Sequence, residues 1–286
     1  MPKDSIQRFD KAAATAALPA RDRATHKKKA SVLIIAGSAQ YLGASLLCGR
    51  AAYRSGAGLV HLALPGPLAL SAMAALPELV VHGLGKGAQL DHSHLKAIHG
   101  LAAPVQAVAV GPGLGRAPGT QRLVRSLWKS LPKRSVFDAD ALAALDLKIE
   151  PGAERVLTPH EGELALLLGD QALALGRPTA ARSLASLGHC VAVLKGPGTL
   201  VANLNGALSL NSTGSSVLAT AGTGDVLTGA IAALMAQGAS PYDAARLGVW
   251  AHGIAAELWA RDHAGRGLLA SDLADGLPGA FALAGA

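Results

Sequence analysis

Short apolar runs alternate along the chain with segments in which apolar residues recur every three or four positions. Most residues of each run are apolar, which is typical of strands buried on both faces of a parallel sheet. The predicted strands are residues 31–37, 58–65, 79–83, 105–113, 135–139, 155–159 and 190–196. Helical patterns lie between them, for example at 43–55 and 120–130. This order predicts an α/β fold with a central, mostly parallel sheet and helices on both faces.

The segment 199–211 departs from this order. Two short apolar runs meet there at Asn205-Gly206, and Asn-Gly is a preferred sequence for a tight β-hairpin turn. A hairpin joins antiparallel strands. We therefore expect an antiparallel hairpin at one edge of the otherwise parallel sheet.

The last third of the chain is predicted to be helical. After Asp225 the apolar residues share one helical face up to Gly238, at positions 226, 227, 230, 231, 234 and 235. A second helix is predicted to begin with Ser240 as its N-cap and Pro241 at its first position. Small residues on both helices allow the two to pack closely.

Composition and charge limit the class of protein. Half of the 286 residues are apolar and 16% are charged, which allows a large core. The formal net charge of +7 is uneven, because residues 1–30 carry eight Lys or Arg and three Asp. A charge excess at one end is typical of a solvated tail, so no nucleic-acid partner is expected. We predict a basic, flexible N-terminal segment at 1–17 and a single domain at 18–286.

Cys48 and Cys190 lie far apart and form no Cys-x-x-Cys pair. Isolated cysteines of this kind are typical of buried thiols in a reducing compartment. No apolar run reaches the roughly 18 residues of a membrane span, and the N-terminus lacks the apolar region of a signal peptide. The expectation is a cytoplasmic protein of enzyme size with no membrane partner.

Polar and glycine-rich stretches follow the predicted strands, where parallel α/β sheets bind their ligands. They are residues 37–44, 111–115, 158–163, 195–199 and 222–225. Residues 111–115 are not the dinucleotide fingerprint Gly-x-Gly-x-x-Gly, and the chain has no P-loop sequence. Each stretch also has a simpler interpretation, in which the glycines form ordinary turns, His160 is a surface residue and Glu163 begins a helix.

The stretch Gly222-Thr223-Gly224-Asp225 precedes an apolar helix. Amides at such a helix start can converge on an anion such as a phosphoryl group. A carboxylate beside that anion is useful if it accepts the proton of an attacking hydroxyl. We expect the helix dipole to keep Asp225 ionised near neutral pH. The alternative is that Asp225 is only a helix cap and the glycines only a turn.

The same stretch resembles the anion-hole motif of the ribokinase-like superfamily, and residues 159–163 resemble its Pro-Asn-x-x-Glu motif with His160 in place of Asn. Further stretches extend the likeness: AGSAQYLGA, SGAGLV, GPGLG, DADAL, LTPHEGE, KGPGT and ATAGTGDVLTG. Together they resemble the ADP-dependent NAD(P)H-hydrate dehydratases, from about Leu18 to the end of the chain. The first strand ends in Ala-Gly-Ser where these proteins more often have Gly-Gly-Ser.

The resemblance implies a ribokinase-like fold and a repair reaction. NADH or NADPH hydrate of S configuration would be phosphorylated on its ring hydroxyl by ADP, with ATP as another donor, and phosphate would then leave to restore NAD(P)H. AMP and phosphate would be the other products. Asp225 would be the catalytic base and contact the substrate, and Glu163 would help to hold Mg²⁺. The implied nucleotide-binding residues are Lys195, Gly196, Pro197, Gly198, Thr199, Gly222, Thr223 and Gly224. The implied substrate-binding residues are Ala44, Gly113, Gly115, His160 and Asp225.

The resemblance also implies a homo-oligomer, a tetramer, and a functional link to an epimerase, which is expected to be a separate chain. Two alternatives remain from the residues alone. One is a ribokinase-like kinase of a vitamin precursor alcohol, such as hydroxyethylthiazole or hydroxymethylpyrimidine. The other is a non-catalytic nucleotide-binding protein. Asp138 and Asp140 could bond substrate, whereas His252 and Trp250 are interpreted as packing residues.

Overall fold

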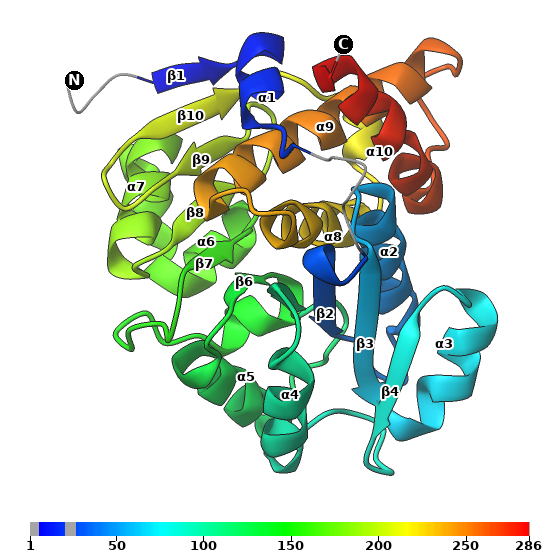
Figure 1. Ribbon diagram of the computed structural model, residues 1–286. Helices are drawn as coiled ribbons and strands as arrows, with labels where there is room; N and C mark the ends of the chain where they lie inside the picture. Colours follow the sequence, from blue (N-terminus) through cyan, green and yellow to red (C-terminus); the bar gives the residue numbers. More distant parts are fainter. Residues whose placement is uncertain (1–5, 21–26, 286) are drawn as a thin grey trace.

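The computed structural model describes residues 6–20 and 27–285. Its strands form one ten-stranded sheet in the order β1-β10-β9-β8-β7-β6-β5-β2-β3-β4 (Figure 1). The strands are β1 (Ile6–Phe9), β2 (Ser31–Ile35), β3 (Leu59–Pro65), β4 (Val80–Leu84), β5 (Ala107–Val110), β6 (Arg134–Phe137), β7 (Arg155–Leu157), β8 (Val191–Leu194), β9 (Leu200–Ala202) and β10 (Leu208–Asn211). Each of the seven strands predicted from an apolar run overlaps one of these, although β4 ends one residue later and β6 begins one residue earlier than predicted.

Helices connect the strands. The α-helices are α1 (Lys11–Ala17), α2 (Leu42–Arg54), α3 (Ala69–Ala75), α4 (Leu95–Ala102), α5 (Pro118–Ser130), α6 (Glu161–Leu168), α7 (Arg177–Leu187), α8 (Thr223–Ala236), α9 (Pro241–Arg261) and α10 (Ala270–Gly285). Short 3₁₀ helices are η1 (Lys27–Ala30), η2 (Gly66–Leu68), η3 (His92–His94), η4 (Ala139–Ala144), η5 (Asp170–Leu175) and η6 (Ser216–Leu218). Ser240 caps α9 as predicted, because its Oγ accepts the amide of Asp243 at 3.1 Å.

The sheet is parallel from β4 to β8, and β9 runs antiparallel to both β8 and β10. The predicted hairpin is therefore confirmed. Its turn is closed by Asn203, whose Oδ1 accepts the amides of Asn205 and Ala207, both at 3.0 Å. The hairpin is not the edge, however, because β1 pairs in parallel with β10, with Ile6 opposite Leu208.

The N-terminal residues that the structure describes are part of the domain. β1 extends the sheet, and α1 packs against α10, where the Thr15 hydroxyl donates to the Ala284 carbonyl at 2.6 Å. Phe9 and Ala14 are buried, so this segment contributes to the core. Residues from Ile6 to Ala17 are thus integrated into the domain rather than separate from it, whereas 1–5 lie outside the described residues.

Helices cover both faces of the sheet, as predicted (Figure 1). Successive strand residues point to opposite faces. Val32 and Ile34 of β2 belong to the cluster formed with α2, α8, α9 and α10, whereas Leu33 and Ile35 belong to the cluster formed with α4, α5 and α7. The predicted burial of Cys48 and Cys190 is confirmed. No helix in the described part of the chain is long and apolar enough to cross a membrane.

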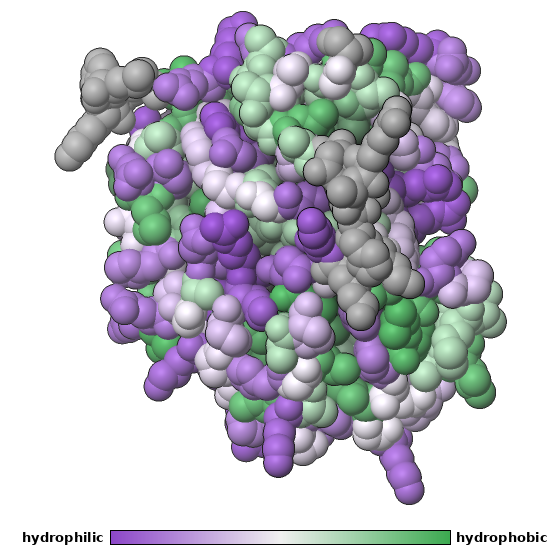
Figure 2. All heavy atoms as spheres, viewed as in Figure 1, coloured by the Kyte–Doolittle hydropathy of each residue, from purple (hydrophilic) through white to green (hydrophobic). Residues whose placement is uncertain are grey.

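Helix α8 lies in the centre of its layer, where it packs on the sheet between α2 and α9 (Figure 1). Every residue from Val226 to Ala236 is buried. The outer surface instead mixes small hydrophilic and hydrophobic patches on the face shown in Figure 2. A helix held in this way can present its first turn to a ligand with little freedom to move.

Candidate functional site

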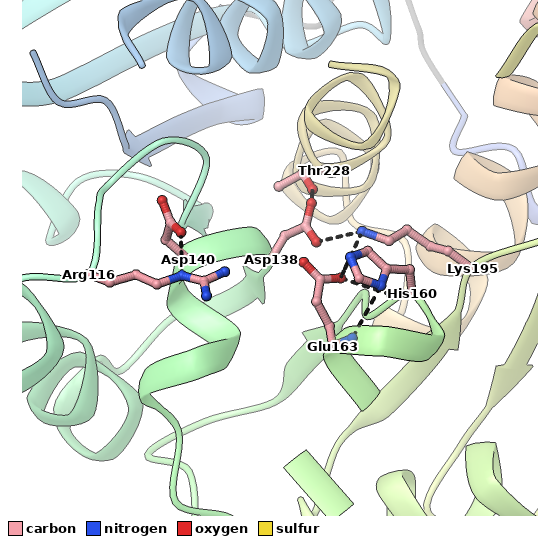
Figure 3. A network of polar contacts seen from close by, with 7 residues as sticks. All are labelled: Arg116, Asp138, Asp140, His160, Glu163, Lys195 and Thr228. Atoms are coloured by element: carbon pink, nitrogen blue, oxygen red, sulfur yellow. Dashed lines mark hydrogen bonds and ion pairs between the residues drawn. The ribbon is translucent and has the colours of Figure 1, made fainter. Parts of the chain in front are cut away.

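The carboxyl ends of three neighbouring parallel strands meet the N-terminus of α8. Asp138 directly follows β6, the stretch ending in His160 follows β7, and Lys195 follows β8. Figure 3 shows Asp138 between Thr228 on α8 and Lys195, with His160 and Glu163 beside the lysine. Sequence positions far apart are therefore brought to one edge of the sheet, where ligands of such folds bind.

The start of α8 is built to receive an anion. Gly222 caps the helix with φ +88°, a left-handed conformation that favours glycine. The Thr223 hydroxyl donates to the carbonyls of Leu218 and Thr220 and so fixes the turn before the helix. Within the described residues, the amides of Gly224 and Asp225 donate to no carbonyl or side chain. These two free donors point to a place for phosphoryl oxygens.

Asp225 is half-buried in the first turn of α8. Burial, together with the negative charge of Asp138 and against the opposing effect of Lys195, raises the pKa of its carboxyl to about 7. The expectation that the helix dipole keeps Asp225 fully ionised at neutral pH is therefore wrong. Loss of hydration and neighbouring carboxylates outweigh the dipole at this position. The result is a stronger proton acceptor than an ordinary aspartate.

Asp138 is almost fully buried, with a residue exposure of 1%. Its Oδ1 accepts from the Lys195 ammonium at 2.9 Å, and its Oδ2 accepts from the Thr228 hydroxyl at 2.6 Å. Sequence analysis treated Asp138 as a residue that could bond substrate. Each of its oxygens accepts from a protein donor, so in this structure Asp138 holds the Lys195 and Thr228 side chains.

Lys195 lies between two carboxylates, since its Nζ is also 3.5 Å from Oε2 of Glu163. Burial by itself lowers the pKa of this ammonium, but Asp138 and Glu163 raise it, and the net direction is upward. Lys195 is therefore charged at neutral pH and fixed in direction. It stands at the first position of the 195–199 loop with its charge balanced by protein groups.

His160 and Glu163 cap the start of α6 reciprocally. The His160 amide donates to Glu163 Oε2 at 2.8 Å, and the Glu163 amide donates to His160 Nδ1 at 3.1 Å. This capping box matches the simpler interpretation that Glu163 begins a helix. Because Nδ1 accepts a bond, a neutral His160 carries its proton on Nε2, and the ring is 60% exposed. Its Nε2 lies 3.5 Å from Oε2 of Glu163, and the exposure of the ring leaves this nitrogen accessible to a ligand.

The residues present fit Mg²⁺ only if a bound substrate and water molecules supply most of the atoms that coordinate the ion. The described residues contain no group of three or more His, Cys, Asp or Glu side chains that could hold a metal ion. Glu163 uses Oε2 for its contacts, and among the described residues no donor bonds its Oε1. Mg²⁺ commonly takes one or two carboxylates, several waters and substrate phosphates. One free carboxylate oxygen beside a phosphate site meets that requirement.

A cavity of about 540 Å³ opens beside the start of α8. Its walls are the 195–199 loop, residues 211–216 and parts of α8 and α9. Of the residues implied to bind nucleotide, Lys195, Gly196, Pro197, Gly198, Thr199, Thr223 and Gly224 line it, whereas Gly222 does not. A second cavity of about 440 Å³ lies at the other edge of the sheet. Its lining includes Arg155 at the start of β7 and Cys190 just before β8, and none of the implied site residues lines it.

Arg177 on α7 supports the 195–199 loop. Its guanidinium donates to Glu161 at 2.9 Å and to the carbonyls of Leu194 and Lys195, both at 3.3 Å. Gly196 passes so close that an added Cβ would lie 2.7 Å from the Arg177 Nη1. The arginine thereby joins the His-Glu-Gly-Glu stretch to the loop that lines the cavity.

The implied substrate residues lie on two adjoining loops. Gly113 has φ +62°, and a Cβ added there would lie 2.5 Å from the Tyr41 carbonyl and 3.1 Å from the Ala44 Cβ. The structure therefore brings Ala44 and Gly113 into contact. The Gly115 amide donates to Asp140 at 2.9 Å, and Arg116 donates to the same carboxylate at 2.9 Å. Asp140 thus holds this loop in place.

Sequence reasoning missed the supporting residues. His252 is buried as predicted, but its Nε2 also bonds the Thr223 carbonyl at 2.9 Å, and burial lowers its pKa to about 4. The role of Arg177 carried no local signal. Only Thr228 offered a hint, because it follows Asp225 by three positions and so shares its helix face. Trp250 is buried, in agreement with a packing role.

Comparisons with known proteins agree with this geometry. A family model described as NAD(P)H-hydrate dehydratase matches residues 32–279. The bifunctional NAD(P)H-hydrate repair enzyme Nnr of Salinibacter ruber is 39% identical over an alignment of 281 positions that covers 93% of this chain and 51% of the relative. The chain thus spans about half the length of the curated relatives it matches.

Solved structures extend the likeness. An ADP/ATP-dependent NAD(P)H-hydrate dehydratase from Bacillus subtilis, co-crystallised with ATP and Mg²⁺, is similar with a TM-score of 0.83 and 32% identity. The match covers 98% of this chain and 99% of that one. A hydroxyethylthiazole kinase from Pyrococcus horikoshii reaches a TM-score of 0.63 at 17% identity over 94% of this chain and 92% of its own, which shows the fold alone. The predicted ribokinase-like fold is confirmed.

Proposed function

Because the chain belongs to the NAD(P)H-hydrate dehydratase family, we propose that it converts the S epimer of NADH or NADPH hydrate back to NAD(P)H, with ADP as the phosphoryl donor. The observation that supports this most directly is the position of Asp225. Its half-buried carboxyl stands at the start of α8, next to two unbonded amides, and the preceding residues Thr223 and Gly224 line the 540 Å³ cavity, although Asp225 itself does not. A base and an anion site one residue apart suit transfer of a phosphoryl group to a hydroxyl.

The proposed reaction has two stages. Asp225 accepts the proton of the ring hydroxyl as its oxygen attacks the terminal phosphorus of ADP, and the bond to the AMP oxygen breaks. The amides of Gly224 and Asp225 donate hydrogen bonds to the oxygens of the transferring group and so stabilise the charge that develops there. The C–O bond of the ester then breaks and phosphate leaves, the adjacent ring carbon loses a proton to solvent, and the ring double bond returns. Phosphorylation thus turns a poor leaving group, hydroxide, into a good one.

The nucleotide is proposed to bind in the 540 Å³ cavity. Its walls include the glycine-rich 195–199 loop, where Gly196 and Gly198 have positive φ values of +136° and +64°. Without side chains in the way, this backbone can approach a phosphate or ribose closely. Gly222 contributes by shaping the helix start rather than by lining the cavity. ATP is a second possible donor, as it is co-crystallised with the B. subtilis relative.

Mg²⁺ is proposed to bind with the nucleotide. Glu163 would hold it through Oε1, directly or through water, since Oε2 is engaged with His160 and Lys195. When bound, the ion would neutralise charge on the phosphoryl oxygens. Glu163 itself remains anchored by the capping box, so its free oxygen keeps a fixed direction.

The hydrate is proposed to lie against Ala44, Gly113, Gly115 and His160. The first two are in contact, and Asp140 fixes the loop that carries the glycines. The exposed His160 ring offers Nε2–H as a donor to a polar group of the substrate. Asp225 would face the hydroxyl where the substrate and nucleotide sites meet.

Three further features are proposals that follow from the family. The relatives are bifunctional and about twice as long, so the partner activity, epimerisation of the hydrate, would be supplied by a separate protein region or chain. The chain is proposed to form a homotetramer. It is proposed to act in the cytoplasm, where NADH and NADPH are used.

The rival function is phosphorylation of a vitamin precursor alcohol. The hydroxyethylthiazole kinase shares the fold at 17% identity, and that likeness carries no site argument. The test is to offer the purified chain NADH hydrate with ADP and Mg²⁺ and to follow the absorbance band of reduced nicotinamide. The expected result is a nucleotide-dependent rise. The proposal fails if neither ADP nor ATP produces a rise while hydroxyethylthiazole or hydroxymethylpyrimidine is phosphorylated.

A further inference from the structure

Asp138 joins the two halves of the proposed active site. One of its oxygens accepts from Lys195, which begins the loop lining the nucleotide cavity. The other accepts from Thr228, which lies one turn beyond Asp225 on α8. These partners are 57 and 90 positions away in the sequence, so a single carboxylate ties two distant elements together.

A structural role by itself does not explain a charged pair at this depth. Burying a carboxylate and an ammonium costs free energy, and apolar residues of similar size are often no less stabilising. Asp138 is 1% exposed, and the Lys195 side chain is 20% exposed. Retaining this pair at the edge of the site points to a requirement of the reaction.

We propose that Asp138 is a positioning residue for phosphoryl transfer: it fixes Lys195 and the first turns of α8 in one arrangement and supplies the negative charge that faces the base. This inference rests on the proposed function of Asp225 as that base. Asp138 itself contacts neither reactant in the proposal, because both of its oxygens bond protein groups.

The charges around Asp225 come from several elements. Asp138 follows β6, Lys195 follows β8, Asp140 lies in η4 and Glu163 in α6, while the Cys48 thiol of α2 is also near. Among the charged groups, Asp138 has the largest effect on the pKa of Asp225 and raises it, whereas Lys195 lowers it. Without the charge of Asp138, the Lys195 ammonium would lower the pKa of Asp225 with less opposition, and Asp225 would be a weaker base.

The first experiment compares Asp138→Asn with wild type in the pH dependence of kcat for hydrate and ADP. The variant keeps the size of the side chain but removes its charge. The acidic limb of the profile is expected to move down by about one pH unit, as is usual for loss of a close charge. At pH 8 we expect kcat to fall by roughly 10- to 100-fold, because the weaker base and the displaced Lys195 both slow transfer.

Thr228→Val is the matched control. It removes the second hydrogen bond of Asp138 and leaves the charge, so the limb should stay in place while kcat falls less than in the asparagine variant. An unchanged limb in a folded Asp138→Asn protein overturns the inference. A shift of the same size in both variants also overturns it, because geometry alone would then explain the profile.

A second measurement does not depend on turnover. Asp225 is harder to ionise in the folded protein than in the unfolded chain, so its contribution to stability falls as pH rises from about 4 through about 7, whereas buried His252, with its pKa lowered to about 4, acts in the opposite direction below about pH 6.5. The melting temperature of wild type minus that of Asp225→Asn isolates the first effect and is expected to fall as pH rises from about 5 to 8. Asp138→Asn should make that fall smaller, and Asp140→Asn should do so to a lesser degree. An equal fall in wild type and both variants contradicts the inference. If ADP and hydrate give no turnover but this pattern holds, the proposed function fails and the charge relation between Asp138 and Asp225 stands.

Discussion

Gly229 of α8 packs directly on the carbonyl of Cys48 in α2. A Cβ built on Gly229 would lie 2.1 Å from that oxygen, well inside van der Waals contact. Glycine at this position lets the two helices approach closely while both of them pack on the sheet. The position of the first turn of α8, and of Asp225 with it, depends on this contact.

Replacing Gly229 with alanine should therefore destabilise the fold. The methyl group would force α2 and α8 apart, and overpacking of this kind typically costs about 1–3 kcal/mol or more. Gly100→Ala in α4 is the matched control, since a Cβ there meets nothing within 4 Å and alanine favours helix. Chemical denaturation of both variants measures the difference. Equal stability of Gly229→Ala and Gly100→Ala would contradict the packing described.

Removing the carboxyl of Asp225 should abolish turnover and spare nucleotide binding. In Asp225→Ala the free amides at the start of α8 and the 195–199 loop remain. Loss of a general base typically slows a reaction by about 10²- to 10⁴-fold. Steady-state assays of hydrate repair and calorimetric titration with ADP separate the two effects. Turnover equal to that of wild type would remove Asp225 from the mechanism.

The activity of wild type should rise with pH on its acidic side. Only ionised Asp225 can accept the proton, and its pKa is raised to about 7 by burial and by Asp138. The rate is therefore low well below pH 7, half-maximal near 7 and highest above it, until another group titrates. A kcat/KM profile from pH 5 to 9 tests this. An acidic limb near pH 4, the range of an ordinary aspartate, would show that burial does not raise the pKa as described.

The same shift predicts that Asp225 costs stability at alkaline pH. Its folded-state pKa lies above the unfolded value of 3.8, so the folded state favours the protonated form. That advantage is complete below about pH 4 and is lost as pH rises through about 7. Asp225→Asn should thus be more stable than wild type at pH 8, by at most about 4 kcal/mol. Denaturation at pH 8 and pH 4 measures it, and the difference should nearly vanish at the lower pH.

Arg177 should matter for nucleotide affinity rather than for chemistry. It bonds Glu161 and two carbonyls at the start of the 195–199 loop, so Arg177→Met frees that loop. We expect the Kd for ADP to rise by roughly tenfold, the equivalent of one or two lost hydrogen bonds, with kcat changed less. Arg182→Met on the same helix is the control, because Arg182 bonds Gly206 in the hairpin turn. Equal affinities in the two variants would rule out the supporting role.

Much of the fold was predictable because its signals are local. Apolar runs marked the strands, Asn205-Gly206 marked the hairpin, and Ser240-Pro241 marked the start of α9. The pairing of β1 with β10 was not predictable, because its four residues are short, partly polar and joined to a strand some 200 positions away. The position of the site was also predictable from local sequence, since glycines and polar residues directly follow the strands that end there.

By itself the sequence determined which residues gather at one sheet edge, because strand ends and helix starts follow from periodicity and turn chemistry along the chain. Only the tertiary structure decided what those residues do to one another. It placed the Lys195 ammonium against the carboxylates of Asp138 and Glu163 and hydrogen-bonded Asp138 to Thr228. It also raised the pKa of Asp225. Hydration loss and Coulomb interactions act through space, between residues that the chain separates by up to 90 positions, and therefore leave no pattern along it.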